Sequence, residues 1–125
     1  MLNCKTNVYR SKQQISSKNL PQLKAELLLY LQQKSKIYCK ALKRHAHLSK
    51  LPDAITERKD AKRRLQRFLV AIDILAKEKT YKQKCFKKHI NYAITGLDAN
   101  NEPVFVHIRE EITQKDRILY FVSCY

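Results

Sequence analysis

No apolar run in this chain is long enough to cross a membrane or to form the hydrophobic region of a secretory signal. The longest run is LLLYL, at residues 27–31, whereas a membrane-spanning helix needs about 20 apolar residues. We therefore expect a protein with no membrane span, located in the cytoplasm. At 125 residues the chain is long enough for one compact domain with a real core, so residues 1–125 are predicted to form a single domain.

Closely spaced cysteine pairs are also missing. The four cysteines, Cys4, Cys39, Cys85 and Cys124, stand far apart with no CxxC motif, which fits free thiols in a reducing compartment. A zinc site would need Cys85 and His89 together with Cys39, His45 or His47, but no second closely spaced pair completes a tetrahedral set. We therefore expect neither a metal nor another cofactor.

Acidic residues are scarce: 11 Asp and Glu stand against 26 Lys and Arg, a net charge of +15. The segment from residue 93 onward holds three basic and five acidic residues, so the positive field belongs to the first three quarters of the chain. Such a field attracts a polyanion, and RNA or another nucleic acid is the expected partner. An acidic protein partner, an anionic membrane surface or simple solubility are the alternatives.

Two amphipathic helices are predicted between residues 20 and 80. Pro21 suits the start of the first, whose apolar residues recur at helical steps up to Leu48 and weaken near Lys34. Pro52 ends this helix, and a second helix follows with a basic first half. These basic residues, candidates for nucleic-acid binding, are Arg58, Lys59, Lys62, Arg63, Arg64 and Arg67. We expect residues 20–80 to form a basic helical hairpin and residues 1–19 a polar arm or an edge strand.

A β-meander is predicted over residues 88–125, where β-branched and aromatic residues replace the helical pattern. The expected strands are 88–97, 103–111 and 117–125, and the only glycine, Gly96, lies near the turn signal at residues 98–101. One register collects the apolar side chains on a single face. They are Ile90, Tyr92, Ile94, Val104, Val106, Ile108, Ile118, Tyr120, Val122 and Cys124. We therefore predict an α+β fold, a two-helix hairpin packed on one face of a C-terminal three-stranded antiparallel β-meander, with a fourth strand near Val8 left open.

The opposite face of this sheet carries polar and aromatic side chains. Pairing Leu97 with Pro103 brings Ala93 opposite His107, Asn91 opposite Arg109 and His89 opposite Glu111, and pairing Glu111 with Arg117 brings Phe121 opposite His107. RNA cleavage by the internal 2′-hydroxyl needs a base, an acid and a cation, and here His107 and Arg109 supply a base or acid and the cation. Phe105, Phe121 and Tyr125 offer rings for stacking on unpaired bases.

Ordinary alternatives remain for these residues. A two-layer fold always has a wet sheet face, on which Glu111 and Arg117 are simply read as a cross-strand ion pair. His45 and His47 are interpreted as structural or solvated. A further cluster on the way to the first strand, Lys82, Lys84, Lys87 and Lys88, extends the positive field and is predicted to contact phosphates.

The order of two helices and three strands, with the endings VHIREE and RILYFVSCY, resembles the RelE-type toxins and the wider barnase, EndoU, colicin and RelE superfamily of small metal-independent RNases. The resemblance implies that the open sheet face cuts RNA with His107, Arg109, Ser123 and Tyr125. It also implies an origin in a phage or mobile element and an acidic antitoxin or immunity protein as partner. We expect a nucleic-acid-binding protein, most concretely an endoribonuclease of toxin type; the alternative is a non-catalytic DNA- or RNA-binding module or an adaptor for an acidic protein.

Overall fold

The computed structural model describes residues 8–51 and 59–125. In chain order the elements are α1 (Leu20–Gln33), β1 (Lys36–Cys39), β2 (Arg44–His47), α3 (Ala61–Gln66), α4 (Phe68–Lys77), β3 (Lys82–Cys85), β4 (His89–Leu97), β5 (Pro103–Ile112) and β6 (Arg117–Cys124). The class is α+β, as predicted. Among the described residues no helix is long and apolar enough to cross a membrane.

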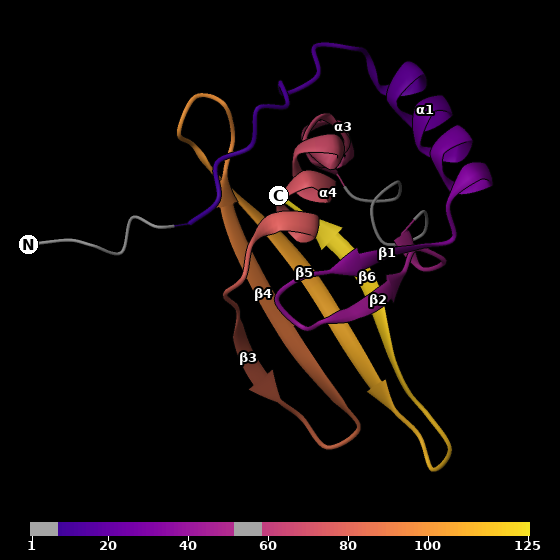
Figure 1. Ribbon diagram of the computed structural model, residues 1–125. Helices are drawn as coiled ribbons and strands as arrows, with labels where there is room; N and C mark the ends of the chain where they lie inside the picture. The colour runs from indigo at the N-terminus through magenta and orange to yellow at the C-terminus, as the bar shows by residue number, and fades with distance from the viewer. Residues whose placement is uncertain (1–7, 52–58) are drawn as a thin grey trace, which may run out of the picture.

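The predicted arrangement is wrong, because the structure contains a six-stranded mixed sheet in the order β1-β2-β6-β5-β4-β3. β2 pairs with β6 in parallel, and the other neighbours pair antiparallel. Helices α3 and α4 lie against one face of the long strands, and α1 lies outside them (Figure 1). The β3–β4 and β5–β6 turns extend beyond the helices (Figure 1). There is accordingly no two-helix hairpin over a three- or four-stranded meander.

The first predicted helix ends early, at Gln33. Asn19 and Gln22 form a capping box at its start, and Lys34 takes an extended conformation (φ −136°, ψ 124°). The residues beyond it form the β1–β2 hairpin, whose turn includes Lys43 at a positive φ of 55°. Ala46 is fully buried in this hairpin. An alternating strand pattern and a helical repeat overlap in so short a segment, so the periodicity alone did not separate them.

The second predicted helix is divided. α3 ends and α4 begins at Arg67, whose backbone (φ −97°, ψ 0°) lies outside ideal helix geometry. The expected start near Asp53 and the candidate Arg58 lie outside the described residues. α1 packs against α3, and Leu23 and Leu27 are its buried residues.

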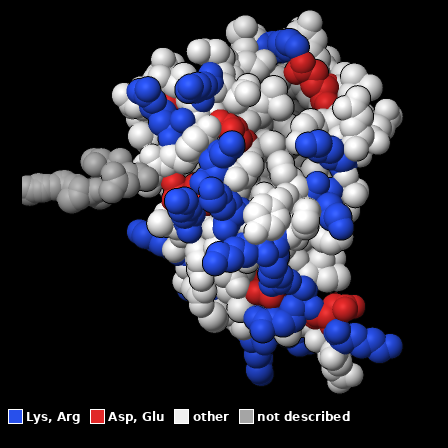
Figure 2. Space-filling model, in the orientation of Figure 1, with Lys and Arg blue, Asp and Glu red and all other residues white. Residues whose placement is uncertain are grey.

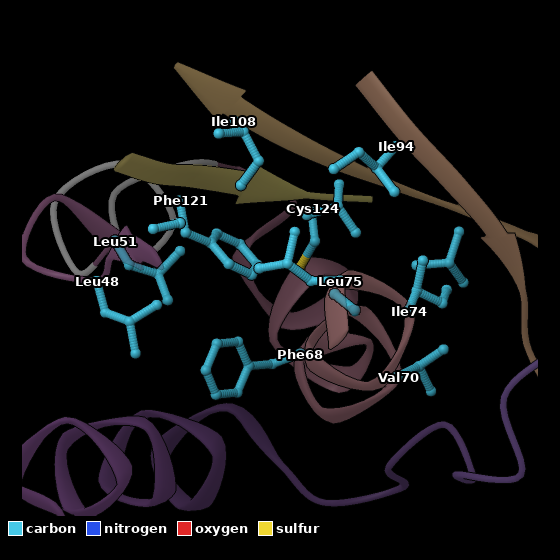
Figure 3. Packing of buried hydrophobic residues seen from close by; sticks show 14 of the residues in the cluster. Leu48, Leu51, Phe68, Val70, Ile74, Leu75, Ile94, Ile108, Phe121 and Cys124 are labelled. Carbon is cyan, nitrogen blue, oxygen red and sulfur yellow. The ribbon is translucent and has the colours of Figure 1, made fainter. Parts of the chain in front are cut away.

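The core lies between α4 and the strands. Phe68, Ile74 and Leu75 of α4 point toward Ile94, Ile108 and Phe121 of the sheet (Figure 3). A Cβ atom on Gly96 would lie 2.6 Å from Cγ1 of Ile74. The only glycine of the chain therefore marks the closest approach of α4 to β4, and not the turn that follows.

The three long strands occupy nearly their predicted ranges, but only one of the two predicted registers is right. Leu97 pairs with Pro103 and Ala93 with His107, as expected. In the second hairpin Glu111 pairs with Ile118, one residue from the prediction, and the ladder is irregular between His107 and Ile108. A shift of one residue exchanges the two faces of a strand. Leu119 and Phe121 consequently enter the core, while Ile118 and Tyr120 turn to the other face.

The N-terminal segment runs beside the end of β4, as an edge strand would, but forms only an isolated parallel bridge between Arg10 and Leu97. Side chains fasten it to α4: the Tyr9 hydroxyl and the Ser11 hydroxyl both donate to Oδ2 of Asp73, at 2.8 and 2.7 Å. The Tyr9 amide donates to Oε1 of Glu78 at 2.6 Å. The segment thus ties α4 to the sheet.

Candidate nucleic-acid interface

The sheet face turned away from α3 and α4, here called the open face, carries a row of side chains that crosses five strands. Backbone pairing aligns His47 of β2, Tyr120 of β6, Arg109 of β5, Asn91 of β4 and Lys84 of β3. Because neighbouring strands lie about 4.8 Å apart, paired residues on one face are in reach of each other. The row contains two cations, a histidine, an amide and a phenol, and no carboxylate.

Tyr120 is the centre of a group that no sequence pattern revealed. The His47 ring lies 5.9 Å from the Tyr120 ring, and Nζ of Lys50 lies 4.4 Å from its centroid. Lys50 also forms an ion pair with Glu111, which follows Arg109 by two residues on β5 and lies on the same face. The predicted Glu111–Arg117 pair is therefore wrong, since Arg117 instead binds Glu110 at 3.0 Å.

Arg109 and His107, the two leading candidates from the sequence, both lie partly exposed on the open face. Nε of Arg109 lies 3.5 Å from Oδ1 of Asn91, a long hydrogen bond directed along the row. His107 lies two residues away on the same strand, between Ala93 and Ser123. The structure thus brings Arg109 beside Tyr120 and Asn91, and keeps His107 on the same side of the sheet.

The other two catalytic candidates have different surroundings. Ser123 is buried, and its hydroxyl accepts a hydrogen bond from Nη1 of Arg64. Tyr125 is exposed; its ring stacks on Phe105 with 5.2 Å between centroids, and Arg64 lies 5.0 Å from the Tyr125 ring. Of the three rings predicted to stack on bases, Phe105 and Tyr125 therefore lie together. Phe121, with 0% of its surface exposed, packs in the core and cannot stack on a base.

The basic candidates fall into two groups. Lys82, Lys84, Lys87 and Lys88 on β3 and the following turn are exposed, as are Lys59, Lys62 and Arg63 at α3. Arg64 and Arg67 are partly buried: Arg64 binds Asp60 at 2.9 Å, and Arg67 donates to the Arg63 carbonyl. Figure 2 shows that Lys and Arg outnumber Asp and Glu on the face that carries the helices, down to the projecting end of the sheet. The positive field is therefore not limited to the open face.

A buried carboxylate lies on the helix side of the same projecting end. Glu110, with a side chain 2% exposed, accepts from Arg44 at 2.7 Å, from Arg117 at 3.0 Å and from the Tyr92 hydroxyl at 2.7 Å. Burial raises the pKa of Glu110, but the hydrogen bonds from Tyr92 and Arg44 and the two positive charges outweigh it, so the pKa lies below its ordinary value. Burial, together with the bond to Glu110, raises the pKa of Tyr92 to about 12. This network joins the β1–β2 hairpin to β5 and β6.

The residues considered for a zinc site do not come together. Cys39 is buried on β1 and Cys85 is exposed on β3, at opposite edges of the sheet. Within residues 8–51 and 59–125, His, Cys, Asp and Glu form no group of three that could hold a metal ion. Burial raises the pKa of the Cys124 thiol to about 12, so this cysteine is a poor nucleophile at neutral pH.

His47, Lys50 and Tyr120 are the site residues that sequence reasoning missed. The first two were assigned to the long first helix, and Tyr120 to the buried face of the last strand. Comparison with protein-family models, with curated proteins and with solved structures returns no match to this chain.

Proposed function

We propose that this protein binds single-stranded nucleic acid across the open face of its sheet. The observation that carries the proposal is the row from His47 to Lys84, which aligns two cations, a histidine, a tyrosine ring and an amide over five strands without a carboxylate. Lysine and arginine bind the phosphates of a strand, and exposed rings stack on its unpaired bases. The net charge of +15 supplies the long-range attraction.

Stacking favours a single strand over a duplex. The pair Phe105 and Tyr125 is exposed at one end of β5 and β6, and Tyr120 lies on the same face nearer their other end. Aromatic side chains on a sheet reach bases only where these are unpaired, because a duplex hides its base faces. Lys50 and Arg64, which contact the Tyr120 and Tyr125 rings, place positive charge beside each stacking position.

Cleavage of RNA is the activity that we propose for this surface. The 2′-hydroxyl would lose its proton to a base and attack the adjacent phosphorus; the bond to the 5′-oxygen breaks, and an acid protonates that oxygen. His107, two residues from Arg109 on β5, and His47, which pairs with Tyr120 on the far side of β6, are the histidines that we assign to proton transfer. Arg109 would stabilise the charge that develops on phosphorus. Ser123 has no part in this proposal, because it is buried and bonded to Arg64.

The test is incubation of the purified protein with labelled RNA in EDTA. We expect cleavage that leaves 2′,3′-cyclic phosphate ends, and a loss of about 100-fold or more in rate for His107→Ala or Arg109→Ala, with RNA binding retained. His47→Ala identifies the second proton-transfer group, and His45→Ala, at an exposed position paired with Tyr38, is the matched control.

Two results would contradict these proposals at different levels. RNA that is shifted on a gel but stays intact would remove the nuclease activity and leave a binding module. RNA that is neither cut nor shifted would remove nucleic acid altogether. An acidic protein, such as an antitoxin or immunity protein, would then be the partner that the positive surface attracts.

A further inference from the structure

Two adjoining hollows lie along the β3, β4 and β5 part of the open face. The first, about 280 Å³, is lined by Lys82, Lys84, Ala93, Phe105, His107 and Tyr125 among others. The second, about 490 Å³, is lined by Val8, Tyr81 and Thr95 together with Lys82, Ala93 and Phe105. Lys82, Ala93 and Phe105 therefore belong to both hollows, so the two lie side by side.

The small side chain of Ala93 accounts for the two hollows. It is exposed in the middle of β4, paired with Lys82 on one side and with His107 on the other. Its neighbours on the same face of β4, Asn91 and Thr95, carry larger side chains. A single methyl group between two long side chains leaves a depression in the sheet surface, which a larger residue would fill.

Phe105 is held in place at the border between the hollows. Its ring is partly exposed and stacks on Tyr125 at an interplanar angle of 29°. Tyr125 in turn contacts the guanidinium of Arg64, which an ion pair with Asp60 fixes. The ring is thus supported before any ligand arrives, so stacking a base on it costs little side-chain entropy.

The charged residues that line the hollows favour an anionic ligand. Lys82 and Lys84 line the first hollow, and Lys82 lines the second; no Asp or Glu is among the described residues that line either. A ring for stacking, a cation beside it and no carboxylate are the features that a nucleotide requires, since it combines a flat base with a phosphate. The first volume, about 280 Å³, lies just below the range of small-molecule sites, about 300–1,000 Å³, and the second, about 490 Å³, lies within it.

We propose that the two hollows hold two successive nucleotides of a single strand, with one base on the face of the Phe105 ring that Tyr125 leaves free and Lys82 at the intervening phosphate. This inference rests on the proposed function and names its base-contacting site. It places base stacking at one end of the open face, next to the row through Arg109, with which the first hollow shares Lys84.

The test compares two single strands of equal length, a short oligoadenylate and the same ribose-phosphate backbone without bases. Fluorescence anisotropy at about 50 mM salt measures the affinity for each. We expect the unmodified protein to prefer the strand with bases by roughly tenfold or more. Ala93→Leu, which fills both hollows, and Phe105→Leu, which removes the ring, should abolish most of this preference and leave the affinity for the abasic strand unchanged.

Ala25→Leu, the same substitution at an exposed alanine of α1, is the matched control and should keep the preference. Thermal unfolding confirms that each variant is folded, and Phe105→Leu carries the test if Ala93→Leu does not fold. Retention of the preference in both variants would overturn the two-nucleotide site while nucleic-acid binding stands. Failure of the unmodified protein to bind either strand would overturn the proposed function as well.

Discussion

At the scale of single residues, Glu110 shows how one buried charge organises a part of the fold. Its carboxylate accepts hydrogen bonds from residues of three other strands, namely Arg44, Tyr92 and Arg117. A buried carboxylate is stable only when such partners satisfy it. Arg44 and Arg117 are themselves half exposed, so the network satisfies the acid without burying two further charges.

We predict that Glu110→Gln lowers the free energy of unfolding by about 2 kcal/mol at neutral pH, since it removes charge-assisted hydrogen bonds. Because the pKa of Glu110 is lower in the folded state than its ordinary value, its stabilisation is complete above the unfolded pKa, near 4.3. It is lost as the pH falls through the folded pKa. Urea unfolding of both proteins as a function of pH measures this difference.

Glu111→Gln is the control for that experiment, because Glu111 is the neighbouring carboxylate and its ion pair with Lys50 is partly exposed. We expect a change below about 1 kcal/mol there. A Glu110→Gln protein as stable as the unmodified one at pH 7 would contradict the role assigned to the network. A difference in the free energy of unfolding between the two proteins that stays the same in strong acid would also contradict it.

At the scale of elements, α1 buries a smaller share of its residues than α3 and α4 do. Leu23 and Leu27 are buried, but Leu28 and Leu29 are more than half exposed. Its start is well defined by the Asn19 and Gln22 capping box and by Pro21. Local capping therefore contributes a large share of what holds this helix in place.

We predict that Asn19→Ala costs about 1 kcal/mol of stability and that the loss appears first in α1. Hydrogen exchange should show faster exchange of the α1 amides, with α4 and the central strands unchanged, because regions with few buried contacts open locally. Ser17→Ala, at an exposed serine just before the cap, is the control. Uniform acceleration over the whole chain would show instead that α1 unfolds only together with the core.

At the scale of the whole molecule, the net charge of +15 is spread over both layers. The exposed lysines of β3 and its turn, the row on the open face and the outer residues of α3 all contribute. Such a distribution attracts a polyanion from many directions, whereas in the function proposed above the open face and its rings hold the strand. Attraction and placement are therefore separate properties of the surface.

We predict a steep salt dependence of nucleic-acid binding. Proteins that contact several phosphates lose about 10³-fold or more in affinity between roughly 50 and 200 mM salt. Lys84→Gln, on the open face, should reduce the slope of log K against log salt by about 1, whereas Lys24→Gln on α1 should leave it unchanged. Anisotropy titrations at four salt concentrations measure both slopes, and equal slopes for the two variants would place the strand elsewhere.

Several features were readable from the sequence because they depend on neighbours along the chain. The helix start at Pro21, the three long strands and the β4–β5 register follow from local patterns and a short turn. Alternation placed His107, Arg109 and Phe105 on the open face of β5 correctly. The excess of lysine and arginine needed no structure at all.

Other features were decided by contacts between distant segments. Residues 34–48 fit a helix or a hairpin about equally well, and the strand form prevails where Ala46 pairs with Leu119 of β6. The irregularity at His107 turns Phe121 into the core beside Phe68 and Tyr120 toward His47. The sequence by itself determined the charge of the chain, and its local pattern determined the three long strands. Only burial against distant residues decided the register of the last strand and the partners of Arg109. The reason is that the free energy of packing depends on residues far away in the sequence.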